Sequence, residues 1–404
     1  MLTAGEANLS RRHFLRLIGA GATISVLAAC APAGQAPSEQ APAAEGDMIK
    51  LSHWQHHAAG TSAAVEEFKK NFEAANPNVT IDFQPIPWSD FWGKLASAIA
   101  AGKGSAPDVF QIPMGLLEEY IAGDNLLPVS ETAISVADIE KNYLPWTIQR
   151  GKHGDQYYGL PLNVQTLVMF RNNALYEEAG LDPTLPFIDH ADLFDQAQKL
   201  TKKSGDQTDQ IGCNTDYYSA WQTNLFQQYL QREQNGQPWV DPATNQLVWS
   251  NYPALLDTFK WFCDLSAQTD DSSFLKGQSR FALGKVGMQI GHPVNRGDLK
   301  VEAPDLQYTV VPFPPRSSTQ ELYTGGTHWM WVVGKWTDYA DMAWNWVSFA
   351  TNREAQETWV NVAGDLPSFS ELVNDERFRQ DGNAAVCMDS LSYATPWEWV
   401  GWAE

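Results

Sequence analysis

The chain has 404 residues, of which 44% are apolar and 12% aromatic. It is therefore long enough for two or three domains and too hydrophobic for a disordered protein. Its 27 Lys and Arg stand against 48 Asp and Glu, and the formal net charge of -21 repels nucleic acid and anionic lipid head groups, so we expect no nucleic-acid partner. Seventeen Trp in so acidic a chain suit neutral polar ligands with apolar faces, such as sugars.

Cysteine is scarce and predicts neither a disulfide scaffold nor a sulfur-bound metal. The four positions are Cys30, Cys213, Cys263 and Cys387, and none forms a Cys-x-x-Cys pair. We expect no cofactor.

The first thirty residues have the order of an export signal. Arg11 and Arg12 form a twin-arginine pattern, and the apolar run 17–29 that follows is too short to span a bilayer. The run ends in Leu-Ala-Ala before Cys30, which resembles a bacterial lipobox and implies cleavage and lipidation at that cysteine. We expect a signal peptide over 1–29 and an extracytoplasmic, lipid-anchored protein; an uncleaved apolar helix with an incidental cysteine is the alternative.

Residues 31–47 contain Ala, Pro, Gly, Gln, Ser, Glu and Asp without one aromatic or β-branched side chain. Such a segment cannot bury apolar surface, so residues 30–47 are expected to be a lipidated cysteine and a flexible tether.

The next segments alternate strand and helix patterns. A strand over 49–54 precedes a helix that is expected to begin near Ser62 and end before Asn76, and a second strand follows at 79–83. Ser89 is a plausible N-cap for a helix that ends at Gly102, and 108–112 supplies a third strand. This order predicts a parallel sheet whose ligand side lies beyond the carboxyl ends of the strands.

Two strand-like segments at 157–162 and 166–171 with a three-residue connection indicate a crossing between two lobes. Helices are expected near 190–203, 219–232, 253–265, 338–351 and 353–362, and strands at 286–290, 308–311 and 328–333. Trp261, Trp344, Trp346 and Trp359 recur at helical spacing and are expected to pack in the core.

Several motifs in chain order resemble those of family 1 extracellular solute-binding proteins. They are Pro107-Asp108-Val109-Phe110, Tyr158-Gly159-Leu160-Pro161, Arg171-Asn172-Asn173, Ala179-Gly180-Leu181, the segment 281–288, Gly325-Gly326 and Gly364-Asp365-Leu366-Pro367-Ser368. The resemblance spans roughly residues 48–400. Arg171 and Asn173 depart from the family's usual Tyr and Lys, which is expected to change the surface of that turn.

The resemblance implies an α/β fold of two lobes with a ligand cleft, the periplasmic-binding-protein (Venus flytrap) fold, with several crossings between lobes. We place the crossings near Asn163, at 310–313 and at 336–345. Lobe 1 is then 48–163 plus 310–340, and lobe 2 is 164–309 plus 341–404. The family usually continues past this point with further helices, so we expect either a fragment or a member without them, with exposed apolar surface near Trp397, Trp399 and Trp402.

Sugar binding needs flat aromatic faces and polar partners for hydroxyl groups, and the loops after the first three strands offer both. The candidates there are Trp54, His56, His57, Trp88 and Gln111. Trp54 fits the lobe core equally well, and Trp88 fits a hydrophobic staple before the helix cap. A metal site of His53, His56 and His57 is disfavoured because no nearby Cys or acid completes a tetrahedron.

Gln165 lies in the first crossing, where the resemblance places a carboxylate or amide that binds sugar hydroxyls. The remaining candidates are Tyr217, Tyr218, Trp221, His292, Asn295, Arg296, Gly325, Gly326, His328 and Trp397. Tyr217, Tyr218 and Trp221 match a stretch where relatives carry stacking residues, although a core role is the alternative. A plain hairpin turn is the alternative for the two glycines.

The resemblance implies a binding protein rather than an enzyme: the substrate-binding subunit of an ABC importer. Its expected partners are a sugar or oligosaccharide, a two-subunit permease with a cytoplasmic ATPase and the membrane through its lipid anchor, and the protein is expected to be a monomer. A secreted glycoside hydrolase is the alternative, but the acids Asp108, Glu118, Glu119 and Asp365 are isolated in sequence. The same fold binding glycerol phosphate, a polyamine or iron is a further alternative.

Overall fold

The computed structural model describes residues 48–217, 220–221, 224–225, 240–241, 244, 246–247 and 253–396. These residues belong to one compact unit that begins at Gly46. The predicted signal peptide, Cys30, the tether, Tyr218 and Trp397 lie outside the described residues. None of the helices in these ranges combines the length and hydrophobicity that a membrane crossing requires.

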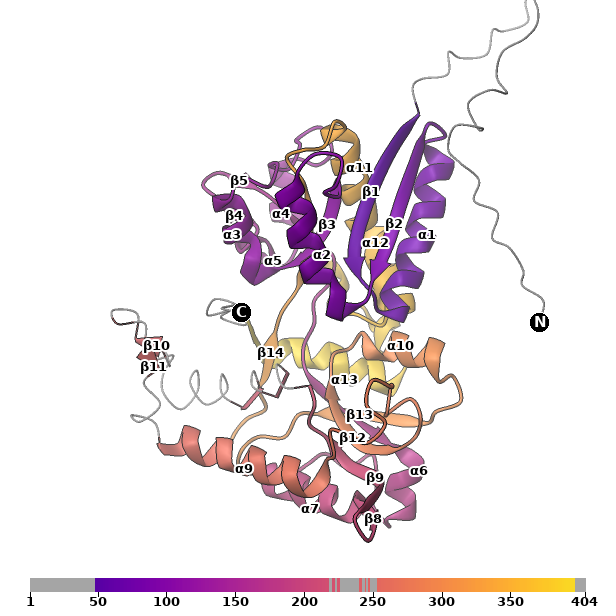
Figure 1. Ribbon diagram of the computed structural model, residues 1–404, viewed down its shortest axis with the longest axis vertical. Helices are drawn as coiled ribbons and strands as arrows, with labels where there is room; N and C mark the ends of the chain where they lie inside the picture. The colour runs from indigo at the N-terminus through magenta and orange to yellow at the C-terminus, as the bar shows by residue number, and fades with distance from the viewer. Residues whose placement is uncertain are drawn as a thin grey trace, which may run out of the picture. The chain divides into compact units, whose positions relative to one another are not determined.

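Lobe 1 is built on a five-stranded sheet in the order β2-β1-β3-β15-β6 (Figure 1). Its strands are β2 (Val79–Ile86), β1 (Ile49–His56), β3 (Val109–Pro113), β15 (Trp329–Val333) and β6 (Leu160–Pro161). The first three are parallel, with Leu51 opposite Ile81 and His53 opposite Val109, whereas β15 runs antiparallel to β3. The predicted β-α-β-α-β order is therefore confirmed, and a returning strand extends the sheet.

Lobe 2 contains a second five-stranded sheet in the order β13-β7-β12-β9-β8. Its strands are β13 (Tyr308–Pro312), β7 (Val168–Asn172), β12 (Val286–Gly291), β9 (Gln207–Asn214) and β8 (Lys202–Ser204). β12 pairs parallel with β9 and antiparallel with β7. The carboxyl ends of β9 and β12 therefore lie at the same edge of this sheet.

Helices cover both sheets. In chain order they are α1 (Ala59–Ala75), α2 (Trp88–Ala101), α3 (Leu117–Ala122), α4 (Val136–Asn142), α5 (Pro145–Gln149), α6 (Asn173–Glu178), α7 (His190–Leu200), α9 (Pro253–Thr269), α10 (Asn295–Glu302), α11 (Ala340–Thr351), α12 (Arg353–Thr358) and α13 (Gly382–Ser390). A π-helical turn, η6 (Trp359–Ala363), follows α12, and the short strands are β4 (Lys152–His153), β5 (Gln156–Tyr157), β10 (Val240–Asp241), β11 (Gln246–Leu247), β14 (Thr324–Gly326) and β16 (Ala394–Pro396).

Two predicted helix starts differ from the structure. α1 begins at Ala59, three residues before Ser62, and its N-cap Ala58 offers no side-chain hydrogen bond. α2 begins at Trp88 after Pro87, and the Ser89 hydroxyl bonds to Asp90 instead of capping the helix. Proline fixes its own φ in a range compatible with a helix start, which explains why α2 begins before the serine.

The three crossings between the lobes differ in part from the predicted ones. The first runs through 162–167, as expected near Asn163. The second follows β13, because 308–312 pairs with β7 of lobe 2 before the chain returns to β15. α11 packs against β15 and α1 of lobe 1, so the third crossing lies after Phe369, not at 336–345, and it leads to α13 on β13.

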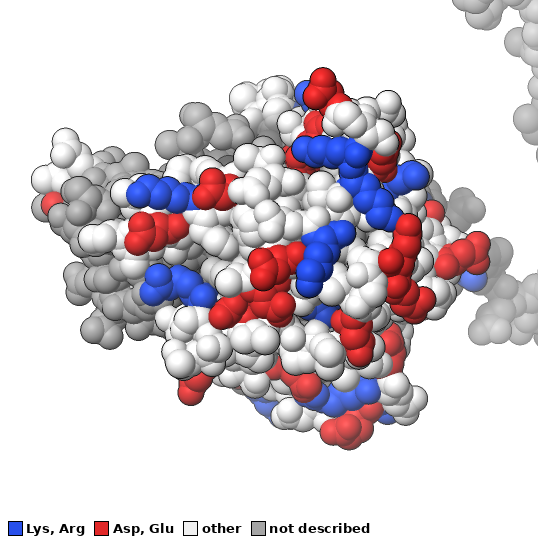
Figure 2. Space-filling model, turned by 90° about the horizontal axis from the view of Figure 1, so that it is seen from below, with Lys and Arg blue, Asp and Glu red and all other residues white. Residues whose placement is uncertain are grey.

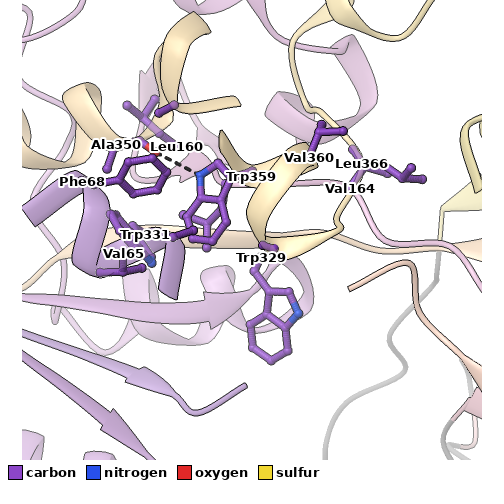
Figure 3. Packing of buried hydrophobic residues seen from close by; sticks show 14 of the residues in the cluster. Val65, Phe68, Leu160, Val164, Trp329, Trp331, Ala350, Trp359, Val360 and Leu366 are labelled. Carbon is purple, nitrogen blue, oxygen red and sulfur yellow. Dashed lines mark hydrogen bonds between the residues drawn. The ribbon is translucent and has the colours of Figure 1, made fainter. Parts of the chain in front are cut away.

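The core near the crossings is rich in indole rings, and Figure 3 shows Trp331 and Trp359 among Val65, Phe68 and Leu160. The Trp359 Nε1 donates to the Ala350 carbonyl at 3.0 Å. Trp344, Trp346 and Trp359 are fully buried, which confirms their predicted packing role. The fourth, Trp261, stacks on His190 with ring centroids 4.5 Å apart.

Arg171 does not change the surface of its turn, because the side chain is fully buried. Its guanidinium donates to the carbonyls of Pro183 and Leu185 and lies 3.8 Å from the centre of the Phe187 ring. The cation is thus used to hold the 183–187 loop against lobe 2.

Charges of both signs are interspersed on the face seen from below, where Figure 2 shows blue Lys and Arg next to red Asp and Glu. Exposed ion pairs of this kind include Lys202 with Glu178 at 2.6 Å. Such pairs contribute about 0–1 kcal/mol each to stability.

Candidate ligand site at the lobe crossing

Aromatic rings gather where β1 and β15 meet the start of α2. The His56 ring lies 4.5 Å from Trp329 and 5.1 Å from Trp88, and the two indoles are 6.0 Å apart. Trp88 is 48% exposed, while Trp329 points away from the Trp331 and Trp359 cluster (Figure 3). Burial lowers the pKa of His56 to about 4, although a contact with Gln111 acts in the opposite direction and raises it. This imidazole is therefore neutral at pH 7.

A buried polar network joins this cluster to the first crossing. The Trp329 Nε1 donates to Gln165 Oε1 at 3.2 Å, and Gln165 Nε2 donates to Asp365 Oδ1 at 3.1 Å. Asn163 Nδ2 donates to the other oxygen of Asp365 at 2.6 Å. The backbone follows the same path, because Gln165 bridges Thr327 of the second crossing and Val164 bridges Leu366.

Asp365 is fully buried, and burial raises the pKa of its carboxyl to about 8. The two amide hydrogen bonds lower this pKa, but by less than burial raises it. A carboxyl group in this position changes its charge near neutral pH. Sequence reasoning treated Asp365 as an isolated acid, and only the Gly-x-x-Pro motif marked its surroundings.

On the lobe 2 side, His292 continues the arrangement from the end of β12. Its Nδ1 lies 2.8 Å from the Thr166 carbonyl of the first crossing, and the Tyr217 ring is 5.6 Å away. Tyr217 is 41% exposed, whereas burial lowers the pKa of His292 to about 4 and keeps the ring neutral at pH 7. Asn295 supports the turn by accepting from the His292 backbone N–H at 3.0 Å.

The two lobes touch beside this site through glycine. The backbone N–H of Gly60, at the start of α1, donates to Asp298 Oδ1 of α10 at 3.0 Å. A Cβ built on Gly60 would lie 3.0 Å from the Gly297 backbone, and one built on Gly297 would lie 2.2 Å from the Ala363 carbonyl oxygen. α1 has no capping side chain of its own, so lobe 2 provides this hydrogen bond.

Several predicted residues lie elsewhere. Trp54 packs in the lobe 1 core under Lys94, whose Nζ is 4.4 Å from the ring centre. Trp221 is fully buried beside Phe262 and Phe313.

His328 is fully buried as well, 5.5 Å from the Trp146 ring, and burial lowers the pKa of its imidazole to about 3. Both β14 glycines are buried, and they pair with β16 rather than forming a plain hairpin turn. The Gly325 N–H donates to the Asn224 side chain at 3.0 Å.

His57 and Arg296 stand at the margin. His57 lies beyond β1, with Nδ1 3.1 Å from the Ser62 hydroxyl. Arg296 faces the Gly364 carbonyl and Asp381. In the described part of the chain, no group of three or more His, Cys, Asp or Glu could hold a metal ion.

Two α/β lobes joined by crossings, with rings and amides along the first crossing, define a two-lobed binding protein. A family profile described as bacterial extracellular solute-binding protein matches residues 65–386. The chain belongs to this family of extracellular solute-binding proteins.

Two relatives agree with this assignment. An uncharacterized ABC transporter extracellular-binding protein of Pyrococcus horikoshii is 27% identical over 381 residues, covering 89% of this chain and 81% of the relative. The sn-glycerol-3-phosphate-binding periplasmic protein UgpB of Escherichia coli K12 is 28% identical over 189 residues, 43% of this chain and 39% of its own.

Solved structures confirm the predicted two-lobed fold. An ABC substrate-binding protein of Listeria monocytogenes in complex with cycloalternan has a TM-score of 0.70 at 20% identity, over 87% of this chain and 88% of its own. A solute-binding protein of Thermotoga lettingae bound with α-D-tagatose has a TM-score of 0.72 at 18% identity, over 86% and 88%.

Proposed function

We propose that this protein captures a neutral sugar or oligosaccharide between its lobes and delivers it, unaltered, to a membrane permease. The row of side chains along the first crossing carries the proposal. The rings of Trp88, His56 and Trp329 are in contact with one another, and Trp329 donates a hydrogen bond to Gln165. The next residue, Thr166, contacts His292 through its carbonyl, and the His292 ring contacts Tyr217.

The row disfavours an anionic ligand because it offers no cation. Both histidines in it have a pKa near 4 and are neutral at pH 7, and the other members are indoles, a phenol and an amide. Indole and phenol rings stack on the C–H faces of pyranoses, while amides pair with hydroxyl groups. A phosphate ester would need an Arg or Lys here, so this row does not favour glycerol phosphate even though one relative is named for it.

Capture would work as a population shift. A ligand that touches rings of both lobes binds the closed arrangement better than an open one and so favours closure. The Gly60–Asp298 hydrogen bond contributes to the closed arrangement, because it joins α1 to α10.

Isothermal calorimetry against a sugar panel tests the proposal, with sn-glycerol 3-phosphate and putrescine as further arms. We expect saturable binding of at least one neutral saccharide and, by mass spectrometry, an unchanged ligand. A cleaved glycoside would establish the hydrolase alternative. Binding of only the phosphate ester or the polyamine would refute the neutral-sugar proposal.

Variants of the two exposed rings test the location. Trp88→Ala and Tyr217→Ala are each expected to weaken sugar binding by ten-fold or more, since stacked aromatic groups at binding sites contribute about 2 kcal/mol or more. Their thermal melts should change little because both rings are about half exposed. Tyr339→Ala is the matched control: this ring is 39% exposed and precedes α11, outside the row.

We further propose export as a lipoprotein anchored through Cys30, with a two-subunit permease and its ATPase as partners. The Arg11-Arg12 pattern and the Leu-Ala-Ala-Cys30 sequence support this. Cys30→Ser should move the protein from the membrane fraction to the soluble fraction. Unchanged membrane retention would contradict the anchor.

A further inference from the structure

A cavity of about 460 Å³ lies away from the ring-and-amide row. It is lined by α10, by η6, and by the segment around 377–384 that leads into α13, and it opens to the solvent. None of the six row members lines it. The cavity touches both lobes, because α10 belongs to lobe 2 and η6 packs against α1 of lobe 1.

The Arg296 guanidinium lines this cavity and is incompletely paired. Its side chain is only 13% exposed, and Nε has no hydrogen-bond partner among the described residues. Nη1 reaches the Gly364 carbonyl at 3.5 Å, and Nη2 is 4.0 Å from Asp381. The nearby Cys387 thiol is a weak neutral acceptor, because burial raises its pKa to about 11.

The charged groups that line the cavity leave this cation in excess, and the nearby buried Asp365 carboxyl, with a pKa of about 8, is mostly neutral at pH 7. Lys300, one turn along α10, also lines the cavity and forms no ion pair within the described residues. Arg377 is already neutralised by Asp375 at 2.6 Å and Glu357 at 2.9 Å. Asp381 is 61% exposed and caps α13 through the Asn383 N–H, so its contact with Arg296 is weak.

A buried guanidinium with open donors is costly unless an acceptor satisfies it. The cavity, at about 460 Å³, is larger than one inorganic ion needs. Phe378, Leu306 and Val362 add apolar wall. We propose that this cavity binds a small organic oxyanion, a carboxylate or a phosphate ester, with its charged group on Arg296 and Lys300 and its carbon body on the apolar wall.

Calorimetry and thermal shift on the purified protein test this with three probes at matched ionic strength. Sodium phosphate and sodium succinate distinguish the two oxyanion types, and sodium chloride is the blank. We expect saturable binding of phosphate or succinate. Arg296→Gln should weaken it at least ten-fold, because a charge-assisted pair is lost, and Lys300→Gln by about three-fold, because that lysine is solvent-exposed.

Two controls make the result specific. Lys70→Gln removes an exposed lysine from α1 and should leave anion binding unchanged. Trp88→Ala should also leave it unchanged, which separates this site from the proposed sugar site. The proposal is overturned if neither anion binds saturably, if Lys300→Gln has no effect, or if Trp88→Ala weakens the anion as much as Arg296→Gln does. Lys300 is exposed, so its variant decides the matter even if Arg296→Gln fails to fold.

Discussion

The tight contact between α10 and η6 predicts that Gly297 cannot be replaced without cost. A Cβ at this position would lie 2.2 Å from the Ala363 carbonyl oxygen and 2.5 Å from its carbon. Ordinary carbon–oxygen contacts are about 3.3 Å or longer, so α10 and η6 would have to separate by roughly 1 Å. Both neighbours are backbone atoms, which cannot rotate away as a side chain can.

We therefore expect Gly297→Ala to lower the free energy of unfolding by about 1–3 kcal/mol, the usual cost of overpacking. Urea unfolding followed by tryptophan fluorescence measures this change. The same separation lengthens the Gly60–Asp298 hydrogen bond, so sugar binding under the proposed function should weaken as well.

Gly93→Ala is the matched control, because Gly93 lies within α2 and a Cβ there meets nothing within 4 Å. Alanine in a helix interior should stabilise the protein by about 0.5–1 kcal/mol. A Gly297→Ala protein as stable as the wild type, alongside a stabilised Gly93→Ala protein, would show that the lobes do not approach this closely in solution.

Three further predictions follow from buried groups. The Asp365 pKa of about 8 exceeds the ordinary 3.8, so between these two pH values the folded state binds a proton that the unfolded state does not. The free energy of unfolding should therefore fall by up to about 1.4 kcal/mol per pH unit as the pH rises from 3.8 to 8. Urea unfolding at a series of pH values should show this fall in the wild type and not in Asp365→Asn, and an equal fall in both proteins would contradict the prediction. His53 should affect the pH dependence of stability in the opposite direction, because burial lowers its pKa from 6.5 to about 3. The free energy of unfolding should fall as the pH falls below 6.5, and in the same titration His53→Phe should lose less stability than the wild type. Of Cys213, Cys263 and Cys387, only the exposed Cys263 should react with a thiol reagent before denaturation. Labelling of Cys213 or Cys387 in the native protein, located by peptide mass spectrometry, would refute their buried placement.

Local patterns predicted the elements of lobe 1 well because each is specified by its own neighbours. Ala64, Val65, Phe68 and Phe72 form the buried stripe of α1, and the alternation of Val79, Ile81 and Phe83 marks the inward face of β2. Such periodicities depend only on the geometry of a helix or a strand. The starts of α1 and α2 were less accurate, because a capping side chain is only one way to begin a helix.

Candidate site residues were harder to rank, because residue type does not reveal depth. Trp88 and Trp221 have the same side chain and both were candidates for stacking on a sugar, yet one is 48% exposed and the other fully buried. Gln165 was identified by resemblance, but its partner Asp365 is 200 residues away, and the motif around Asp365 did not indicate this pairing.

The sequence by itself determined the export signal's pattern, the order of strands and helices, and the family, because each is written in short-range spacing or in motif order. Only the tertiary structure decided which rings line the first crossing, that Asp365 titrates near neutral pH, and that glycines set the distance between the lobes. Those properties depend on burial and on contacts between segments such as Gly60 and Gly297, which are far apart along the chain and meet only when both lobes are folded.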